Sequence, residues 1–178
     1  RKSDVILAVD AKHHKASKKI IVANSFDYSI ALRKKNSNKF ENNNQDAIVF
    51  LDTGAPLFKT DSHMYGNKLP FTKEQWYPSL VNFFNIIEKK TGSKVIIAAH
   101  PKHQYSEEKS HYFGNRKIFH GKTQDLVFNA SLVLVTNSTA VSYAIMFNKP
   151  VLILISNEFI EDSNILIQES NYLANMLG

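Results

Sequence analysis

Four short polar stretches each follow an apolar run of the sequence, and they hold most of the side chains that could do chemistry. They are Asp52-Thr53-Gly54, His100-Pro101-Lys102, His120-Gly121-Lys122 and Asn137-Ser138-Thr139. Imidazole, ammonium and hydroxyl groups donate hydrogen bonds to anions, and they can stabilise charge that develops on a departing phosphate. The pattern therefore predicts a site that binds a phosphorylated ligand.

The stretch Asn137-Ser138-Thr139 lies between a predicted strand at 132–136 and a predicted helix at 138–147. A helix N-terminus exposes backbone N–H groups and partial positive charge, so it can bind a phosphate when it follows a strand. Small polar residues are also the usual N-caps of helices. Taken alone this motif favours capping, and phosphate binding needs support from another strand end.

His100 supplies that support, because it ends the apolar run 94–99 and is followed by Pro101 and Lys102. Proline cannot continue a central strand, and it fixes the turn that aims the histidine. His100 can donate a hydrogen bond to a phosphate or stabilise a leaving group. A histidine satisfied by a loop carbonyl is an equally good interpretation of this residue alone.

Several other kinds of chemistry are disfavoured. The chain has no cysteine, which excludes disulfides and thiolate metal sites. Glu107 and Glu108 lie near His103 and His111, but in a predicted polar loop without the tight spacing of a metal site, so we expect no metal and no cofactor. Asp52 could act as a base, although a strand-end aspartate more often caps the next turn. No nucleophile elbow surrounds Ser138, and the chain has neither a P-loop nor a dinucleotide-binding glycine motif.

The elements that must position these side chains follow from the apolar pattern. Uniformly apolar runs predict strands at 47–51, 94–99, 117–119, 132–136 and 151–155. Helical spacing predicts helices at 72–90, 123–130, 138–147 and 158–177, with Thr72 and Thr123 as N-caps and Gly92 as a C-cap. Residues 102–115 are predicted to form a polar loop. Uniformly apolar strands are typical of parallel sheets covered on both faces. The predicted fold is therefore an α/β, doubly wound, Rossmann-like parallel sheet, with the four polar stretches at the carboxyl ends of its strands.

The predicted domain boundary falls in the asparagine-rich stretch 36–45. Residues 1–45 are interpreted as an N-terminal arm and linker, with short strands at 5–9 and 20–23 and a helix at 27–35. Residues 46–178 form the predicted main domain. The chain begins with Arg1 rather than Met, so we expect it to be a fragment whose arm is the remnant of a preceding domain.

The chain carries a formal net charge of +6, and its basic residues concentrate at 12–19 and 33–35. A basic surface can attract nucleic acid, anionic lipid or phosphorylated small molecules. No zinc-finger spacing or RNA-binding signature is present, so we expect no nucleic-acid partner. No uncharged apolar run reaches the roughly 18 residues of a membrane span.

Two segments together, "VIIAAHPKH" (95–103) and "IFHGKTQDLVFNASLVLVTNSTAVSYAIMFNKPVLIL" (118–154), resemble the C-terminal, nucleotide-sugar-binding half of a GT-B glycosyltransferase. The nearest resemblance is to bacterial capsule and surface-polysaccharide transferases of the sialyltransferase-like and Kdo-transferase-like groups, which carry a His-Pro and a later Ser-Thr motif.

The resemblance implies that His100 is the catalytic residue at the donor phosphate and that Pro101 and Lys102 shape its loop. Asn137, Ser138 and Thr139 would bind the same phosphate. His120 and Gly121 would lie beside the nucleotide base.

It further implies a nucleotide-sugar donor, often CMP-linked, and a saccharide or glycolipid acceptor. The general base would come from outside this chain. We expect a cytoplasmic enzyme of surface-polysaccharide synthesis, with its basic arm at the inner face of the membrane.

Two alternatives stay open. The first is another enzyme with the same architecture, either a glycerophosphate transferase or a sugar-nucleotide 2-epimerase. The scarcity of carboxylates at the predicted strand ends disfavours the epimerase. The second is a non-catalytic α/β module that binds a phosphorylated ligand or a protein.

Overall fold

The computed structural model describes residues 5–8, 19–22, 26–37, 46–54, 56–57, 71–102, 111–155 and 165–177. The chain divides into two compact units, Arg1–Phe40 and Glu41–Gly178. In the smaller unit, strands β1 (Val5–Ala8) and β2 (Lys19–Val22) pair in parallel, and helix α1 spans Phe26–Ser37. The predicted basic stretch 12–18 and most of the predicted linker lie outside the described residues.

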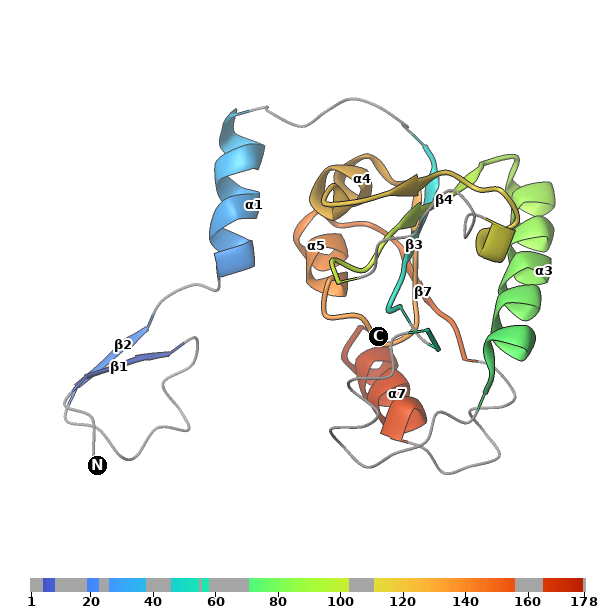
Figure 1. The fold of residues 1–178 in the computed structure, drawn as a ribbon. Helices are drawn as coiled ribbons and strands as arrows, with labels where there is room; N and C mark the ends of the chain where they lie inside the picture. Colours follow the sequence, from blue (N-terminus) through green and yellow to red (C-terminus); the bar gives the residue numbers. More distant parts are fainter. Residues whose placement is uncertain are drawn as a thin grey trace. The chain divides into compact units, whose positions relative to one another are not determined.

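The larger unit contains a five-stranded, all-parallel sheet in the order β5-β4-β3-β6-β7 (Figure 1). Its strands are β3 (Ile48–Leu51), β4 (Val95–Ala98), β5 (Ile118–Phe119), β6 (Leu132–Val135) and β7 (Val151–Ile153). The strand β3 is central, with β4 on one side and β6 on the other. The predicted α/β, doubly wound parallel sheet is confirmed.

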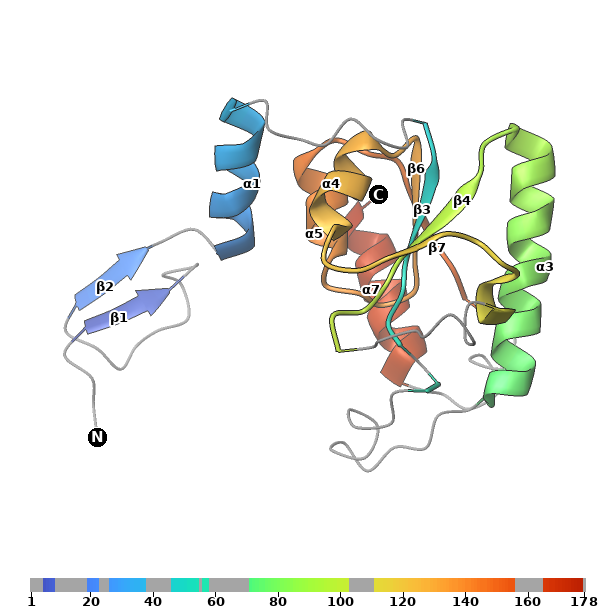
Figure 2. The same cartoon turned by 45° about the horizontal axis from the view of Figure 1, so that its top comes forward.

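Helices cover both faces of this sheet, as Figure 2 shows. Helix α3 (Lys73–Thr91) covers one face, and α4 (Thr123–Asn129), α5 (Val141–Met146) and α7 (Ile165–Leu177) cover the other. Ile48 and Phe50 of β3 pack in the core beneath α3, whereas Val49 and Leu51 pack in the core beneath α4 and α5. Since side chains alternate along a strand and both faces are buried, every position of β3 must be apolar.

Helix α3 begins and ends where the sequence predicts. The backbone N–H of Thr72 donates to Gln75 Oε1 at 2.9 Å, which satisfies a donor at the helix N-terminus. Gly92 caps the other end in the left-handed conformation, with φ of 75°, and its N–H donates to the carbonyl of Glu88. Both predicted caps are confirmed.

Two other helix starts differ from the sequence-based prediction. The N-cap of α4 is Lys122 and not Thr123, which is the first helical residue. Helix α5 begins at Val141, three residues later than predicted. For α7 the described helix starts at Ile165, and 156–164 lie outside the described residues.

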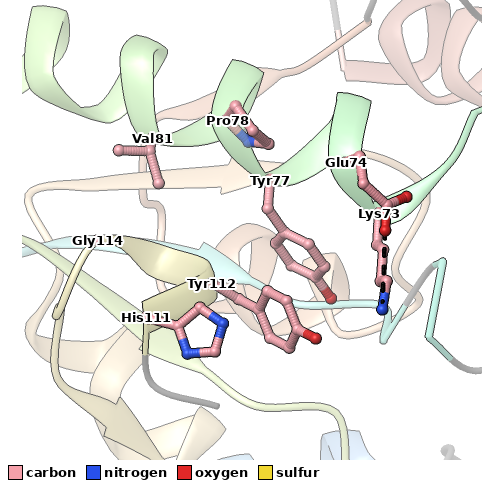
Figure 3. Close-up of a pocket in the computed structure, with 8 residues that line it drawn as sticks. All are labelled: Lys73, Glu74, Tyr77, Pro78, Val81, His111, Tyr112 and Gly114. Atoms are coloured by element: carbon pink, nitrogen blue, oxygen red, sulfur yellow. Dashed lines mark ion pairs between the residues drawn. The ribbon is translucent and has the colours of Figure 1, made fainter. Parts of the chain in front are cut away.

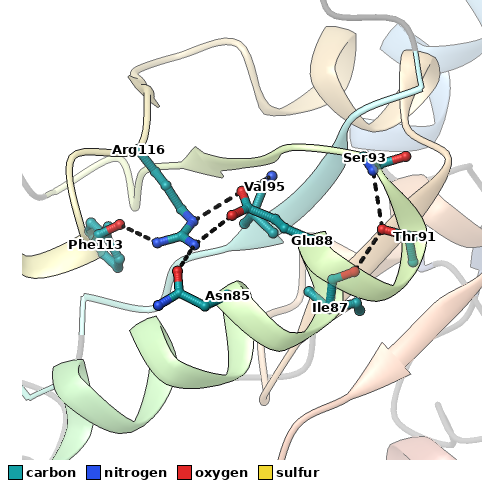
Figure 4. Close-up of polar contacts among 8 residues, drawn as sticks. All are labelled: Asn85, Ile87, Glu88, Thr91, Ser93, Val95, Phe113 and Arg116. Atoms are coloured by element: carbon teal, nitrogen blue, oxygen red, sulfur yellow. Dashed lines mark hydrogen bonds and ion pairs between the residues drawn. The ribbon is translucent and has the colours of Figure 1, made fainter.

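Arg116 joins the segment before β5 to helix α3 (Figure 4). Its guanidinium donates to both carboxylate oxygens of Glu88, at 3.3 and 2.8 Å, and also to Asn85 Oδ1 and the carbonyl of Phe113. The Arg116 and Glu88 side chains are only 8% and 17% exposed. Burial alone would raise the pKa of Glu88, but hydrogen bonds from Arg116 and from the N–H of Val95 lower that pKa overall.

No helix among the described residues combines the length and the apolar character needed to span a bilayer.

Candidate functional site

The strand order defines where a ligand should bind. From β3 the chain adds β4 and then β5 on one side, and it then crosses over to add β6 and β7 on the other side of β3. The order of addition therefore reverses between β3 and β6. In open α/β sheets ligands bind outside the carboxyl ends of the strands at such a switch point. The segments that follow β3 and β6 are Asp52-Thr53-Gly54 and Thr136-Asn137-Ser138.

The five strands end level at this edge. Their last residues form one row: Ala98 pairs with Phe119 and with Leu51, Val135 pairs with Ile153, and the pair Phe50–Leu134 sets the register between β3 and β6. The four predicted polar stretches all begin within two residues beyond this row, so the structure brings them to one edge. The ends of β4 and β6 lie about 10 Å apart there, two strand spacings, with the end of β3 between them.

Asp52 organises the centre of this edge. It is only 5% exposed, and its Oδ1 accepts a hydrogen bond from the N–H of Gly54 at 2.9 Å. Its Oδ2 accepts from the N–H of His100 at 3.3 Å, which ties the turn after β4 to the turn after β3. Asp52 therefore caps and positions turns, as the more common interpretation of a strand-end aspartate predicts.

His100 is half-buried beside Asp52, at the end of β4. Its Nδ1 accepts a hydrogen bond from the N–H of Lys102 at 3.3 Å. In the neutral ring the proton then resides on Nε2. Pro101 and Lys102 are exposed in the turn that follows.

The segment Asn137-Ser138-Thr139 forms a turn and not the first turn of a helix, which corrects the prediction. Ser138 Oγ accepts from the N–H of Ala140 at 3.3 Å, and the Ser138 carbonyl accepts from Val141. These local bonds delay the helix to Val141 and leave α5 only six residues long. Such a short helix has little dipole, so an anion bound at this turn would depend mainly on the turn's own donors.

The same turn nevertheless presents polar groups at the switch point. Within the described part of the chain, the backbone N–H groups of Ser138 and Thr139 donate to no other residue. Ser138 is half-buried and Thr139 is exposed. These adjacent N–H groups and the hydroxyl of Thr139 can donate hydrogen bonds to an anion bound at this turn.

His120 and Gly121 lie at the end of β5, next to β4 and two strands from β3. Both are exposed, and Gly121 has a φ of 66°, which a residue with a side chain adopts only with strain. The edge therefore runs, strand by strand, from His120 through His100 and Asp52 to Asn137.

One contributor was not predicted from the sequence. Ser170 of α7 is fully buried, and its hydroxyl donates to the carbonyl of Thr136 at 3.4 Å, where β6 ends. Thr136 in turn donates from Oγ1 to Asn137 Oδ1 at 3.3 Å. The only sequence signal is a serine on the apolar side of a helical pattern, which does not reveal its distant partner.

Two cavities bounded by described residues lie away from this edge. One of about 740 Å³ lies at the amino ends of the strands, and one of about 430 Å³ lies between α3 and residues 111–114. Across the described residues, no three His, Asp or Glu side chains gather in a way that could hold a metal ion.

Comparisons of this chain with protein-family models, curated proteins and solved structures found no match. The resemblance to GT-B glycosyltransferases therefore stays a prediction from the motifs.

Proposed function

We propose that the larger unit is a nucleotide-sugar-binding glycosyltransferase domain whose donor phosphate binds at the carboxyl ends of β3, β4 and β6. One observation carries the proposal: the switch point between β3 and β6 coincides with the turns that hold the polar groups. The motif resemblance supplies the substrate class, and the sheet topology supports the location.

A phosphate over the end of β3 has donors on both sides in this proposal. The proposal assigns the His100 ring as the donor on the β4 side and the N–H groups of Ser138 and Thr139 as the donors on the β6 side. Gly54, with a φ of 75°, bears no side chain that would block the approach from β3. Lys102, in the turn after β4, adds positive charge.

The chemistry follows from these donors. When a sugar leaves its nucleotide, negative charge grows on the departing phosphate, and fixed donors aimed at that charge lower the barrier. The nucleotide base would lie toward β5, beside His120 and Gly121. The base that deprotonates the acceptor would come from outside this chain.

Calorimetric titration of the chain with CMP, UDP and CDP-glycerol tests the proposal, with cytidine as the control that lacks phosphate. The proposal expects CMP or UDP to bind and cytidine to bind at least about tenfold more weakly, since charge-assisted hydrogen bonds contribute about 1.5–3 kcal/mol. Preference for CDP-glycerol would instead indicate a glycerophosphate transferase. If no nucleotide binds, the proposal is wrong and the alternative of a non-catalytic module is favoured.

A further inference from the structure

The pocket of about 430 Å³ between α3 and residues 111–114 is separate from the strand ends and has a different character. Figure 3 shows its walls: Tyr77, Pro78 and Val81 project from α3, and His111, Tyr112 and Gly114 lie opposite. Lys73 and Glu74, in the first turn of α3, close one side. The volume falls within the range of small-molecule pockets.

Aromatic rings form much of this pocket. Tyr77 is 3% exposed and stacks on the half-buried ring of Tyr112, with centroids 4.5 Å apart. Tyr77 also meets Phe113 edge-on at 5.3 Å, so the core holds its ring in place. His111 lies 4.5 Å from the Tyr112 ring and is exposed. Tyr77 is buried behind Tyr112, so a ligand would meet the exposed parts of the Tyr112 and His111 rings and apolar contacts from Pro78 and Val81.

The polar groups of the pocket are balanced in charge. Lys73 Nζ and Glu74 Oε1 form an ion pair at 3.7 Å. The hydroxyls of Tyr77 and Tyr112 point toward the side on which Lys73 and Glu74 lie (Figure 3). Within the described part of the chain, Tyr112 and His111 make ring contacts but no hydrogen bond through the hydroxyl or the imidazole. The pocket lining therefore combines hydrogen-bond donors with the Glu74 carboxylate as an acceptor, and its net charge is zero.

Pro78 removes one backbone hydrogen bond from the first turns of helix α3. It has no backbone N–H, so it cannot donate the helical hydrogen bond to the carbonyl of Glu74, four residues earlier. Both residues line the pocket. The carbonyl of Glu74 therefore lacks its usual helical donor.

We infer that this pocket binds a neutral saccharide ring. A pyranose presents C–H groups that lie against aromatic faces and a rim of hydroxyls that both donate and accept. The one positive and one negative side chain of the lining cancel, so the pocket has no net charge that would select an anion or a cation. The inference does not depend on a nucleotide site, since it uses none of the residues at the strand ends.

The test uses the isotope-labelled full chain and nuclear magnetic resonance. Glucose, galactose, N-acetylglucosamine and maltose are titrated separately, and the side-chain signals of His111 and Tyr112 are followed. We expect at least one sugar to shift these signals saturably. Adenosine serves as the rival planar ligand.

Variants make the result specific. Replacing the exposed His111 by Ala and truncating the Tyr112 ring by Tyr112→Ala should each weaken sugar binding about fivefold or more, the change expected from losing an aromatic contact. Tyr172→Ala is the matched control, because Tyr172 of α7 is 67% exposed and lines neither described pocket. It should leave the affinity unchanged.

Three outcomes would overturn the inference. They are no shift with any sugar at tens of millimolar, equal weakening by the Tyr172 control, or adenosine binding in preference to every sugar. Failure of CMP or UDP to bind would leave the inference standing, because the two sites are titrated with different ligands.

Discussion

Replacing Asp52 by Asn should loosen the turns at the strand ends while leaving the sheet intact. The Asp52 carboxylate accepts from two backbone N–H groups, those of Gly54 and His100, one through each oxygen. An asparagine offers only one oxygen, and its NH₂ group would face the other N–H donor. Either the turn at Gly54 or the turn at His100 therefore loses its hydrogen bond to residue 52.

The loss of unfolding free energy caused by Asp52→Asn can be estimated from the burial of Asp52. Asp52 is 5% exposed, so water cannot easily replace the lost acceptor. A buried donor left without a partner costs about 1–3 kcal/mol. We expect Asp52→Asn to lower the free energy of unfolding by about 2 kcal/mol, and Asp52→Ala to lower it further because both acceptors are lost.

Urea unfolding of the purified chain measures this effect. Asp46→Asn is the matched control, since Asp46 lies just before β3 at the opposite edge, is exposed, and has a φ of 61° that asparagine tolerates. It removes the same charge and should change the free energy of unfolding by less than about 0.5 kcal/mol. Equal effects of the two substitutions would refute the positioning role of Asp52.

Three further predictions follow from the described contacts. His100→Ala should weaken CMP binding about tenfold while changing the free energy of unfolding by less than about 1 kcal/mol, and unchanged affinity in calorimetry would contradict its role. Since the pKa of Glu88 is lowered in the folded state, its stabilisation is complete above its model-peptide value of 4.5 and is lost as pH falls through the lowered pKa. Glu88→Gln should therefore reduce the loss of unfolding free energy that urea titrations measure as the pH falls below 4.5. Gly114→Ala should destabilise more than Gly92→Ala in the same assay. Both glycines have positive φ, but a Cβ at 114 would lie 2.8 Å from the Arg116 guanidinium, whereas one at 92 meets nothing within 4 Å. If both substitutions lowered the free energy of unfolding equally, Arg116 would have to move aside for the new Cβ, which would contradict a rigidly held Arg116.

The sheet could be predicted from the sequence because its signals are local. Uniformly apolar runs marked all five strands of the main domain, and Thr72 and Gly92 marked both ends of α3. The common edge of the polar stretches also follows, because parallel strands all point the same way. His100, His120 and Ser138 therefore reach one edge without any long-range information.

The details of the site could not be predicted because they depend on contacts between distant residues or on competition within a turn. The bond from His100 N–H to Asp52 joins residues far apart in the sequence, and so does the bond from Ser170 to Thr136. The late start of α5 reflects the Ser138 hydroxyl competing for the Ala140 N–H, which helix propensity alone does not reveal.

The pocket between α3 and residues 111–114 could not be predicted from the sequence either. Tyr77 fits the apolar spacing of a buried helix face, and His111-Tyr112 lies in a stretch predicted to be a polar loop. Their stacking appears only when the segment 111–114 packs against α3.

The most direct measurement is an amide-shift map of the isotope-labelled chain titrated with CMP. The proposed donor site predicts that the largest shifts fall on Gly54, His100, Ser138 and Thr139, with little change at Lys94 near the opposite edge. Shifts confined to the amino ends of the strands, or an unchanged spectrum at saturating CMP, would contradict a phosphate site at the switch point.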